Sequence, residues 1–259
     1  MMAMFRPWVS RTLLAFALFA GGALPASAST GGAAAARDLY VQLCQLSMEV
    51  SMMVYDETSD VYRKQARAAE AALQEPAAAV VKDLSAQDAA AGAGAAENFR
   101  VMHGSMVGGG EFGEGLLNSG YEAKPHGDYD DNLQQLLAAL DKGYNFLGAG
   151  SSVETRAYVL VARTVSAYVR MSASPFGSYT ASFNTEDSDL TKQVTRVDAV
   201  LAELAKKHAA DKEKSQRVKR VNAKWQFIRT TILKAGSQAT PFIVYRHGGD
   251  IMRELKAFN

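Results

Sequence analysis

Two stretches decide the fold: LTKQVTRVDAVLAEL at residues 190–204 and VKRVNAKWQFIRTTI at residues 218–232. In each stretch an apolar side chain returns at alternating steps of three and four residues, which is the spacing of one face of an α-helix. A polar connector rich in Lys, Asp and Ser joins them. The pattern predicts two amphipathic helices that pack as an antiparallel hairpin, with Trp225 as the largest side chain between them.

The same periodicity recurs along the rest of the chain. It predicts further helices at residues 37–55, at 58–84 with a break or kink at Pro76, from Asp128 to about 148, after a cap at Ser151 or Ser152, and from Thr240 onward with a kink or fraying at Gly248-Gly249. The helix after Ser152 is expected to stop at residues 174–177, and caps for the next helix lie at residues 185–188.

No stretch shows the alternation of a β-strand over more than a few residues. The sequence therefore predicts an all-α fold, an antiparallel helical bundle of six or seven helices. Residues 37–55 resemble residues 156–175, and residues 131–147 resemble residues 222–233. These likenesses indicate a duplicated helical unit, or chance similarity among helices of like composition.

Residues 1–28 have the pattern of a secretory signal peptide. Two arginines precede an apolar run at residues 13–24, and small residues follow up to Ala28. The run is shorter than the roughly 20 residues that span a bilayer. We expect cleavage near Ala28, a periplasmic or secreted protein and no transmembrane segment in the mature chain, with an uncleaved anchor as the alternative. Residues 29–36 are expected to be a flexible tether, and residues 37–259 a single helical-bundle domain.

The charge balance gives no reason to expect a nucleic acid partner. The chain has 28 Lys and Arg against 27 Asp and Glu, and Lys and Arg are concentrated only at residues 206–224, where acids interrupt them. This cluster is typical of a solvated helix face, with an acidic partner or lipid headgroups as the alternative. Cys44 is the single cysteine, so no intramolecular disulfide can form.

Residues 89–127 are rich in glycine, which costs about 1 kcal/mol at each interior position of a helix. The composition predicts a long irregular Gly-rich loop within the domain, and loops of this length in compact domains commonly carry function. The candidate binding residues that this loop would present to a partner or ligand are Met102, His103, Met106, Glu111, Phe112 and Glu114.

A sulfur-bearing stripe gives a second candidate site. Cys44, Met48 and Met52 follow at steps of four, so they share one helix face, and thiolate and thioether ligands select Cu(I). The same residue types at this spacing are also ordinary core packing. No CxxC or HxxH pattern accompanies the stripe.

Three further patterns do not meet the requirements of known sites. GGGEFGEG at residues 108–115 lacks the Lys and Ser or Thr of a phosphate-binding loop. HGDYDD at residues 126–131 lacks the spacing of a calcium loop and favours a helix cap with solvated acids. No Ser, His and acid are grouped as in a catalytic triad, so no enzyme activity is predicted.

Part of the chain resembles the periplasmic helical sensing module of type IV pilus methyl-accepting chemotaxis transducers and nitrate/nitrite sensors. The likeness rests on Arg163-Thr164-Val165-Ser166 with Tyr168-Val169, and on Lys224-Trp225-Gln226 followed by Ile228 and Ile232. It covers less than half of the chain, and the Arg-Gln-Arg-Met-Leu-Ser-Gln-Arg run of that family is missing. The resemblance implies a helical bundle that senses a small ligand or partner, and it carries over no binding residue.

These observations predict an exported, non-enzymatic module for binding, sensing or accessory work in the cell envelope. Its partner is expected to be an envelope protein or a small ligand, a homo-oligomer is left open, and no cofactor is required. The alternative is a periplasmic copper-binding bundle that uses Cys44, Met48 and Met52.

Overall fold

The structure, a computed structural model, describes residues 30–119, 123–173, 189–234 and 240–259. In chain order the elements are α1 (Thr30–Tyr55), α2 (Asp60–Gln87), α3 (Ala89–Val107), the 3-10 turn η1 (Gly110–Phe112), α4 (Leu116–Ser119), α5 (Ala123–Tyr144), α6 (Val153–Ala173), α7 (Leu190–Lys207), α8 (Lys212–Leu233) and α9 (Pro241–Lys256). Within these ranges the only β-structure is an isolated bridge between Gly108 and Glu114. The prediction of an all-α bundle is confirmed.

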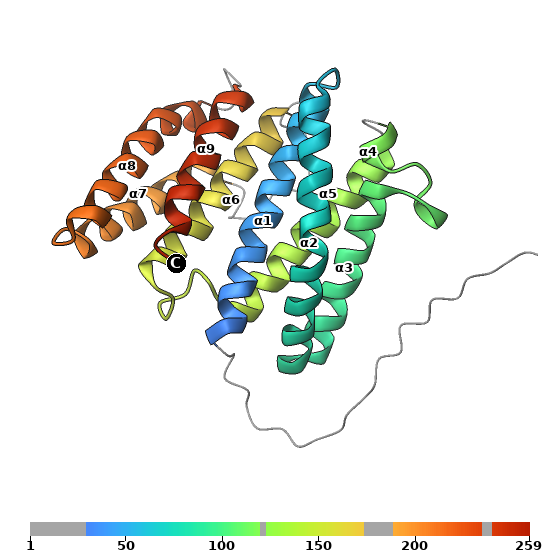
Figure 1. The fold of residues 1–259 in the computed structure, drawn as a ribbon, viewed down its shortest axis with the longest axis horizontal. Helices are drawn as coiled ribbons and strands as arrows, with labels where there is room; N and C mark the ends of the chain where they lie inside the picture. The colour runs from blue at the N-terminus through green and yellow to red at the C-terminus, as the bar shows by residue number, and fades with distance from the viewer. Residues whose placement is uncertain (1–29, 120–122, 174–188, 235–239) are drawn as a thin grey trace, which may run out of the picture.

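In the described part of the chain, the eight long helices form two groups of four that meet along one seam, and the four-residue helix α4 lies outside this arrangement. In the N-terminal group α1 packs on α2, α2 on α3, α3 on α5, and α5 on α1. In the C-terminal group α6 packs on α7, α7 on α8, α8 on α9, and α9 on α6. Figure 1 shows α1 and α6 in the middle of the molecule, where they pack against each other and join the two groups.

The four long helices of each group pack on one another in the same cyclic order, so each helix of one group corresponds to a helix of the other. This correspondence can be compared with the expected duplication. It pairs α1 with α6, as the likeness of residues 37–55 to residues 156–175 predicts. It pairs α5 with α9, whereas the second likeness pairs α5 with α8. A duplicated unit stays a prediction that rests on the first correspondence.

Helix α6 is buried on most sides because both groups cover it. Five consecutive residues, Ala157 to Val161, are each at most 5% exposed, which an amphipathic surface helix does not show. Ser152 caps this helix as predicted, since its Oγ accepts a hydrogen bond from Thr155 N at 3.1 Å. The predicted stop at residues 174–177 lies outside the described residues.

The two deciding stretches form the predicted hairpin of α7 and α8. Trp225 is fully buried, and its Nε1 donates a 2.7 Å hydrogen bond to Asp198 Oδ1 on α7. The side chain of Asp189 caps α7 by accepting from two backbone N–H groups of its first turn. The caps predicted at residues 185–188 lie outside the described residues.

Neither predicted interruption divides its helix, so the break predicted at Pro76 is wrong, whereas a kink at either position stays a prediction. Pro76 lies inside α2 and the helix continues through it, because Leu73, Ala77 and Val80 around it are buried against neighbouring helices. Helix α9 also continues through Gly248 and Gly249. Glycine at position 248 instead allows α9 to lie close to α6.

Two predicted irregular segments are largely helical. The expected tether at residues 29–36 belongs to α1 from Thr30, because its alanines favour a helix and Ala36 is fully buried. The expected Gly-rich loop is helix α3 up to Val107, capped by Asp88, whose side chain accepts from the N–H groups of Ala90 and Ala91. Packing of α3 on α2 and α5 outweighs the cost of its glycines.

The irregular segment that the structure describes within this region is short, and its turn depends on the backbone conformations that glycine adopts. Gly108, Gly109, Gly110 and Gly113 all have positive φ angles, between 58° and 100°, which side chains with a Cβ rarely adopt. Gly109 N donates a 2.7 Å hydrogen bond to Gly113 O and closes the turn. Among the described residues, 108–115, called the glycine hairpin below, are the irregular part of the expected loop.

In the described part of the chain, no helix combines the length and apolarity needed to cross a bilayer. Residues 1–28 lie outside that part, so the signal peptide stays a prediction.

Candidate functional site

A cavity of about 680 Å³ lies between α5 and α6. Both helices pack on α1, but they make few direct contacts with each other among the residues that the structure describes. The space between them is therefore lined by side chains of several helices. Tyr40 and Cys44 come from α1 and Gln193 comes from α7.

Helix α5 contributes the largest part of the lining, and its polar face provides it. The lining residues recur at helical spacing: Asp131, Gln134, Gln135, Leu137, Ala138, Asp141, Lys142 and, just after the helix, Asn145. The opposite face, with Leu133, Leu136 and Leu140, is buried in the core. The core face fixes the helix, and this directs the polar face into the cavity.

Helix α6 contributes two arginines, which stand two helical turns apart on the same face. The side chains of Arg170 and Asp130 are only 12% and 14% exposed, and Nη1 of Arg170 donates to both carboxylate oxygens of Asp130, at 2.8 and 2.9 Å. Arg163 Nη1 lies 3.8 Å from Asp141 Oδ2, which is an ion pair longer than a hydrogen bond. The two pairs cross the gap between α5 and α6 at its two ends.

Charged side chains lie at both ends of the cavity. At one end lie Arg163, Lys142 and Asp141, of which Arg163 and Asp141 form the long ion pair. At the other end lie Asp131 and Arg170, and Arg170 pairs with Asp130, which does not line the cavity. The described lining thus holds three cations and two carboxylates.

Cys44 lies on the α1 side of the cavity as a neutral thiol. Burial raises its pKa from 9.0 to about 12, and the nearby charges of Arg163 and Arg170 only partly oppose this. A thiol of this kind is neither a ready nucleophile nor a ready metal ligand, because both roles need the thiolate.

Asn145 closes the cavity next to Lys142 through a backbone turn. It follows the last residue of α5 with a φ of 49°, a left-handed conformation that asparagine tolerates at helix ends. Its N–H donates to Asp141 O at 2.7 Å, and its own carbonyl accepts from Gly148 N and Ser151 Oγ. The turn is thereby fixed, with the Asn145 side chain in the lining.

None of the six residues predicted for the Gly-rich loop lines this cavity. Met102 and Met106 are in the core because residues 89–107 form a packed helix, and His103 Nδ1 lies 2.5 Å from Glu70 Oε1 on α2. The prediction that an irregular loop presents these three residues is wrong, because α3 holds them.

The other three predicted residues lie in the glycine hairpin. Glu111 forms an ion pair with Arg100, and the guanidinium of Arg100 also lies 5.4 Å from the ring centre of Phe112. A Cβ at Gly104 would come within 2.2 Å of Phe112 Cε2, so the ring packs directly on α3 at this glycine. Glu114 pairs with Gly108 in the isolated bridge. The hairpin is folded back onto its own helix.

The three sulfur residues of the copper alternative are in the core. Cys44, Met48 and Met52 are each at most 2% exposed, and only Cys44 lines the cavity. Among the described residues no group of three or more His, Cys, Asp and Glu side chains could hold a metal ion. This burial matches the packing role, and copper binding stays a prediction.

The acids predicted to cap a helix at residues 126–131 are not at a helix start. Helix α5 begins earlier, at Ala123, so Asp128, Asp130 and Asp131 lie within it. The reason is that Tyr129 and Leu133 are buried and extend the apolar face toward the N-terminus. Asp130 instead pairs with Arg170, and Asp131 lines the cavity.

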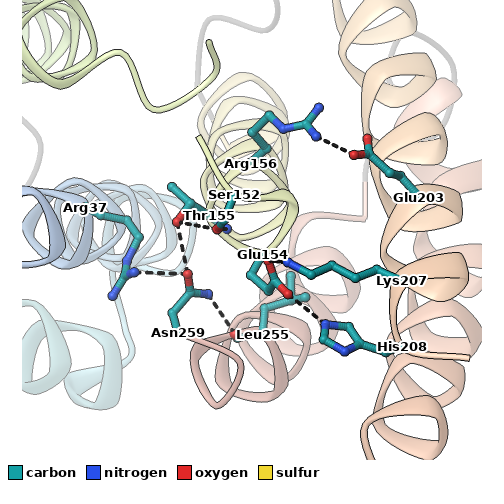
Figure 2. A network of polar contacts seen from close by, with 10 residues as sticks. All are labelled: Arg37, Ser152, Glu154, Thr155, Arg156, Glu203, Lys207, His208, Leu255 and Asn259. Atoms are coloured by element: carbon teal, nitrogen blue, oxygen red, sulfur yellow. Dashed lines mark hydrogen bonds and ion pairs between the residues drawn. The ribbon is translucent and has the colours of Figure 1, made fainter. Parts of the chain in front are cut away.

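A second polar cluster joins α1, α6, α7 and the end of α9 (Figure 2). Glu154, in the first turn of α6, is only 9% exposed in its side chain and contacts Lys207 Nζ at 2.8 Å and His208 Nε2 at 2.7 Å at the end of α7. Burial alone would raise the pKa of Glu154, but hydrogen bonds from Lys207 and His208 outweigh this and hold it below 4.5. An acid at a helix start and cations at a helix end also complement the helix dipoles.

The same cluster holds α9 against α1 and α6. Asn259 Oδ1 accepts from Arg37 Nη1 at 3.0 Å and from Thr155 Oγ1 at 3.1 Å, while its Nδ2 donates to Leu255 O. The contacts of Glu154 and Asn259 link helices to one another, and we assign the cluster a structural role. The basic residues at 206–224 are likewise largely paired, as in Arg220 with Glu254 and Lys224 with Asp250.

No known protein family, curated protein or solved structure matches the chain. The class that the structure itself defines is an all-α protein of two four-helix groups with a polar cavity between α5 and α6. The resemblance to the chemotaxis and nitrate-sensing module stays a prediction.

Sequence reasoning did not identify the cavity residues. The polar face of α5 has the pattern of a solvated helix surface, and the sequence of α5 does not show that α6 lies opposite this face. A signal was present in α6, where Arg163, Ser166 and Arg170 form a narrow polar stripe and the other residues from Ala157 to Val169 are mostly apolar. Such a stripe in a central helix has to be matched by partners or by a cavity.

Proposed function

We propose that the protein is an exported, non-enzymatic binding module of the cell envelope, which holds a small polar organic ligand in the cavity between α5 and α6. The observation that carries this proposal is the cavity itself. Its volume of about 680 Å³ lies within the range of ligand sites, about 300 to 1,000 Å³. Charged, amide and hydroxyl side chains converge on it from α1, α5, α6 and α7.

The lining supports binding rather than catalysis. The one nucleophilic side chain that could react through its thiolate, Cys44, has a pKa of about 12. The described residues that line the cavity include no histidine to act as a general base. The carboxylates of Asp131 and Asp141 are separated by nearly three turns of α5, so they do not form a close acid and base pair.

Export is part of the proposal on the pattern of residues 1–28 alone. The N-terminal sequence of the protein recovered from the cell envelope tests it. A mature chain that starts at Ser29 supports export, whereas a protein that keeps Met1 to Ala28 and stays in the cytoplasm contradicts it.

Ligand binding is tested by a variant that fills the cavity mouth. Ala138 lines the cavity and its side chain is exposed, so Ala138→Trp places a bulky ring there at little cost in core packing. Ala79 is a matched control, because it is an exposed alanine within α2, a helix that contributes no residue to the lining. Both variants should unfold at nearly the same temperature as the unsubstituted protein.

The measurement is a thermal-shift screen against sugars, amino acids, short peptides and small organic acids and amines. A ligand of this site should raise the unfolding temperature of the unsubstituted protein and of Ala79→Trp, and should have no effect on Ala138→Trp. If no compound does so, or if Ala138→Trp responds like the control, the cavity is not a binding site of the proposed kind.

A further inference from the structure

We infer that two copies of this chain associate through a surface at the N-terminal ends of α2 and α9, called the aromatic surface below. Its residues are Val61, Tyr62, Phe242 and Tyr245. Figure 1 shows that α2 and α9 begin at the same end of the molecule, which is also the end at which α1 finishes. The inference does not rest on the proposed ligand site, because none of these four residues lines the cavity between α5 and α6.

Contacts among α1, α2 and α9 fix the position of this surface. Tyr245 Oη donates to both carboxylate oxygens of Glu49 on α1, at 2.8 and 2.9 Å, and lies 3.4 Å from Gln65 Oε1 on α2. The rings of Tyr62 and Tyr245 meet edge to face, with their centres 5.8 Å apart. These contacts hold the first turns of α2 and α9 beside each other.

Two apolar side chains lie one helical turn closer to the helix starts and are largely uncovered. Val61 precedes Gln65 by four residues on α2, and Phe242 precedes Tyr245 by three residues on α9. Each therefore shares a helix face with a residue of the contacts just described. Val61 is 60% exposed and Phe242 is 50% exposed. Exposed apolar side chains beside partly buried tyrosines are typical of the centre of a protein interface.

Charged side chains flank the two apolar residues in a fixed order along the helices. Glu57 in the α1–α2 turn and Asp60 at the first residue of α2 lie nearer the end of the molecule. Lys64 and Arg246 each lie one helical turn after the apolar residue of the same helix. All four are exposed, and none forms an ion pair with another residue that the structure describes. The surface therefore runs from acid through apolar to base.

This order selects a second copy of the chain as the partner. A two-fold axis that crosses α2 and α9 at the level of the apolar residues reverses the second copy, so the acids of each copy face the bases of the other. A two-fold axis parallel to the helices would place acid against acid and base against base, which is unfavourable. A partner with one sign of charge would match only one side of the surface.

The aromatic surface is small, so the dimer should be weak. Stable interfaces commonly bury about 800 Å² on each partner, and smaller ones form transient complexes. We expect a dissociation constant of about 10 to 100 µM, which sedimentation velocity measures on the purified protein between about 5 and 500 µM. Added salt should weaken the dimer, because it screens charges that lie at the exposed edge of the interface.

Phe242→Glu and Val61→Glu test the apolar centre of the interface. Both residues are exposed and lie in the first turn of a helix, where an acid complements the helix dipole, so the unfolding temperature should not fall. Each variant places two carboxylates in the centre of the dimer, so its dissociation constant should rise about tenfold or more. Ala79→Glu, at an exposed alanine farther along α2, is the matched control and should dimerise like the unsubstituted protein.

Charge reversals test the two-fold arrangement. Lys64→Glu and Asp60→Lys should each weaken the dimer of that variant, because like charges then face each other twice. An equimolar mixture of the two variants should form the dimer again, because the new acid of one copy faces the new base of the other. The double variant, which carries both reversals, should also dimerise like the unsubstituted protein.

The outcomes decide the inference without reference to the ligand screen, because the aromatic surface and the cavity share no residue. A protein that stays monomeric throughout the concentration range overturns it. A dimer that Phe242→Glu and Val61→Glu leave unchanged also overturns it, as does a mixture of the charge-reversed variants that stays monomeric. Dimerisation that is lost in the two apolar variants and recovered in the mixture supports it.

Discussion

Gly248 of α9 lies directly against Val165 of α6. A Cβ at position 248 would come within 2.3 Å of Val165 Cγ1, and Val165 is itself fully buried and stiff at χ1. The contact fixes how closely the last helix approaches the central one. It also explains why a glycine is present within α9, which continues through this position.

We expect Gly248→Ala to lower the free energy of unfolding by about 1 to 3 kcal/mol, because the added methyl group overpacks the α6–α9 contact. Gly249→Ala is the matched control. It adds the same methyl group to the same helix with nothing within 4 Å, so it should stabilise the protein by about 0.5 to 1 kcal/mol. Urea unfolding followed by circular dichroism measures both. Equal effects of the two substitutions would contradict the close packing at position 248.

Trp225 should carry a large share of the stability of the α7–α8 hairpin. The side chain is fully buried and also donates a hydrogen bond to Asp198, so Trp225→Ala should cost about 3 to 5 kcal/mol. Phe227→Ala, two residues away on the same helix and 58% exposed, removes only an edge contact with the His247 ring and should cost about 1 kcal/mol or less. Chemical unfolding measures the pair, and a small effect at Trp225 would contradict the predicted and observed hairpin core.

Glu154 should make stability depend on acid pH. Its pKa in the folded protein lies below 4.5, so its ionised form stabilises the fold above about pH 4.5, and this contribution is lost as the pH falls through the folded pKa. Glu154→Gln should therefore cost about 1 to 3 kcal/mol near pH 7, and the difference from the unsubstituted protein should shrink below pH 4.5.

The control for this experiment is Glu213→Gln. The Glu213 side chain is 86% exposed and lies 3.7 Å from Arg217, which is typical of a weak surface pair. Its replacement should change stability little at any pH. If Glu154→Gln behaves in the same way across the pH series, the contacts to Lys207 and His208 do not stabilise the fold.

Cys44 should be nearly inert toward thiol reagents in the folded protein. A pKa raised from 9.0 to about 12 lowers the thiolate fraction at pH 8 about a thousandfold, and the side chain is 1% exposed. Absorbance with an aromatic disulfide reagent measures the rate, and the same single cysteine in urea-unfolded protein is the control. Labelling of the folded protein at the unfolded rate would show that Cys44 is open and ionised, and would favour the copper alternative.

Local sequence was enough to predict the helices that have one apolar face and a clear cap. The stripes around Trp225, the cap at Ser152 and the proline start of α9 all lie where the spacing placed them. In each case the signal and the structure it determines lie within one or two helical turns. This is the range over which helical spacing and capping act.

Local sequence was not enough where contacts between helices decide the outcome. The glycines of α3 and α9 are unfavourable within an isolated helix, but Gly104 and Gly248 lie where another side chain comes close. The same reason hides the cavity, since Arg163 and Asp141 come from different helices and form one site only after both pack on α1. The composition of one segment cannot show that a side chain of another helix lies close to it.

The packing of α1 against α6 determines how the chain should behave if its backbone is cleaved between the two groups of helices. Cleavage of the backbone in the turn at residues 145–152 would produce two fragments with four long helices each. By helix number alone, each fragment resembles a complete four-helix domain. Each fragment would nevertheless expose one bare apolar flank, that of α1 or that of α6. The fragments should therefore recover native structure by complementation when mixed, and aggregate when kept apart.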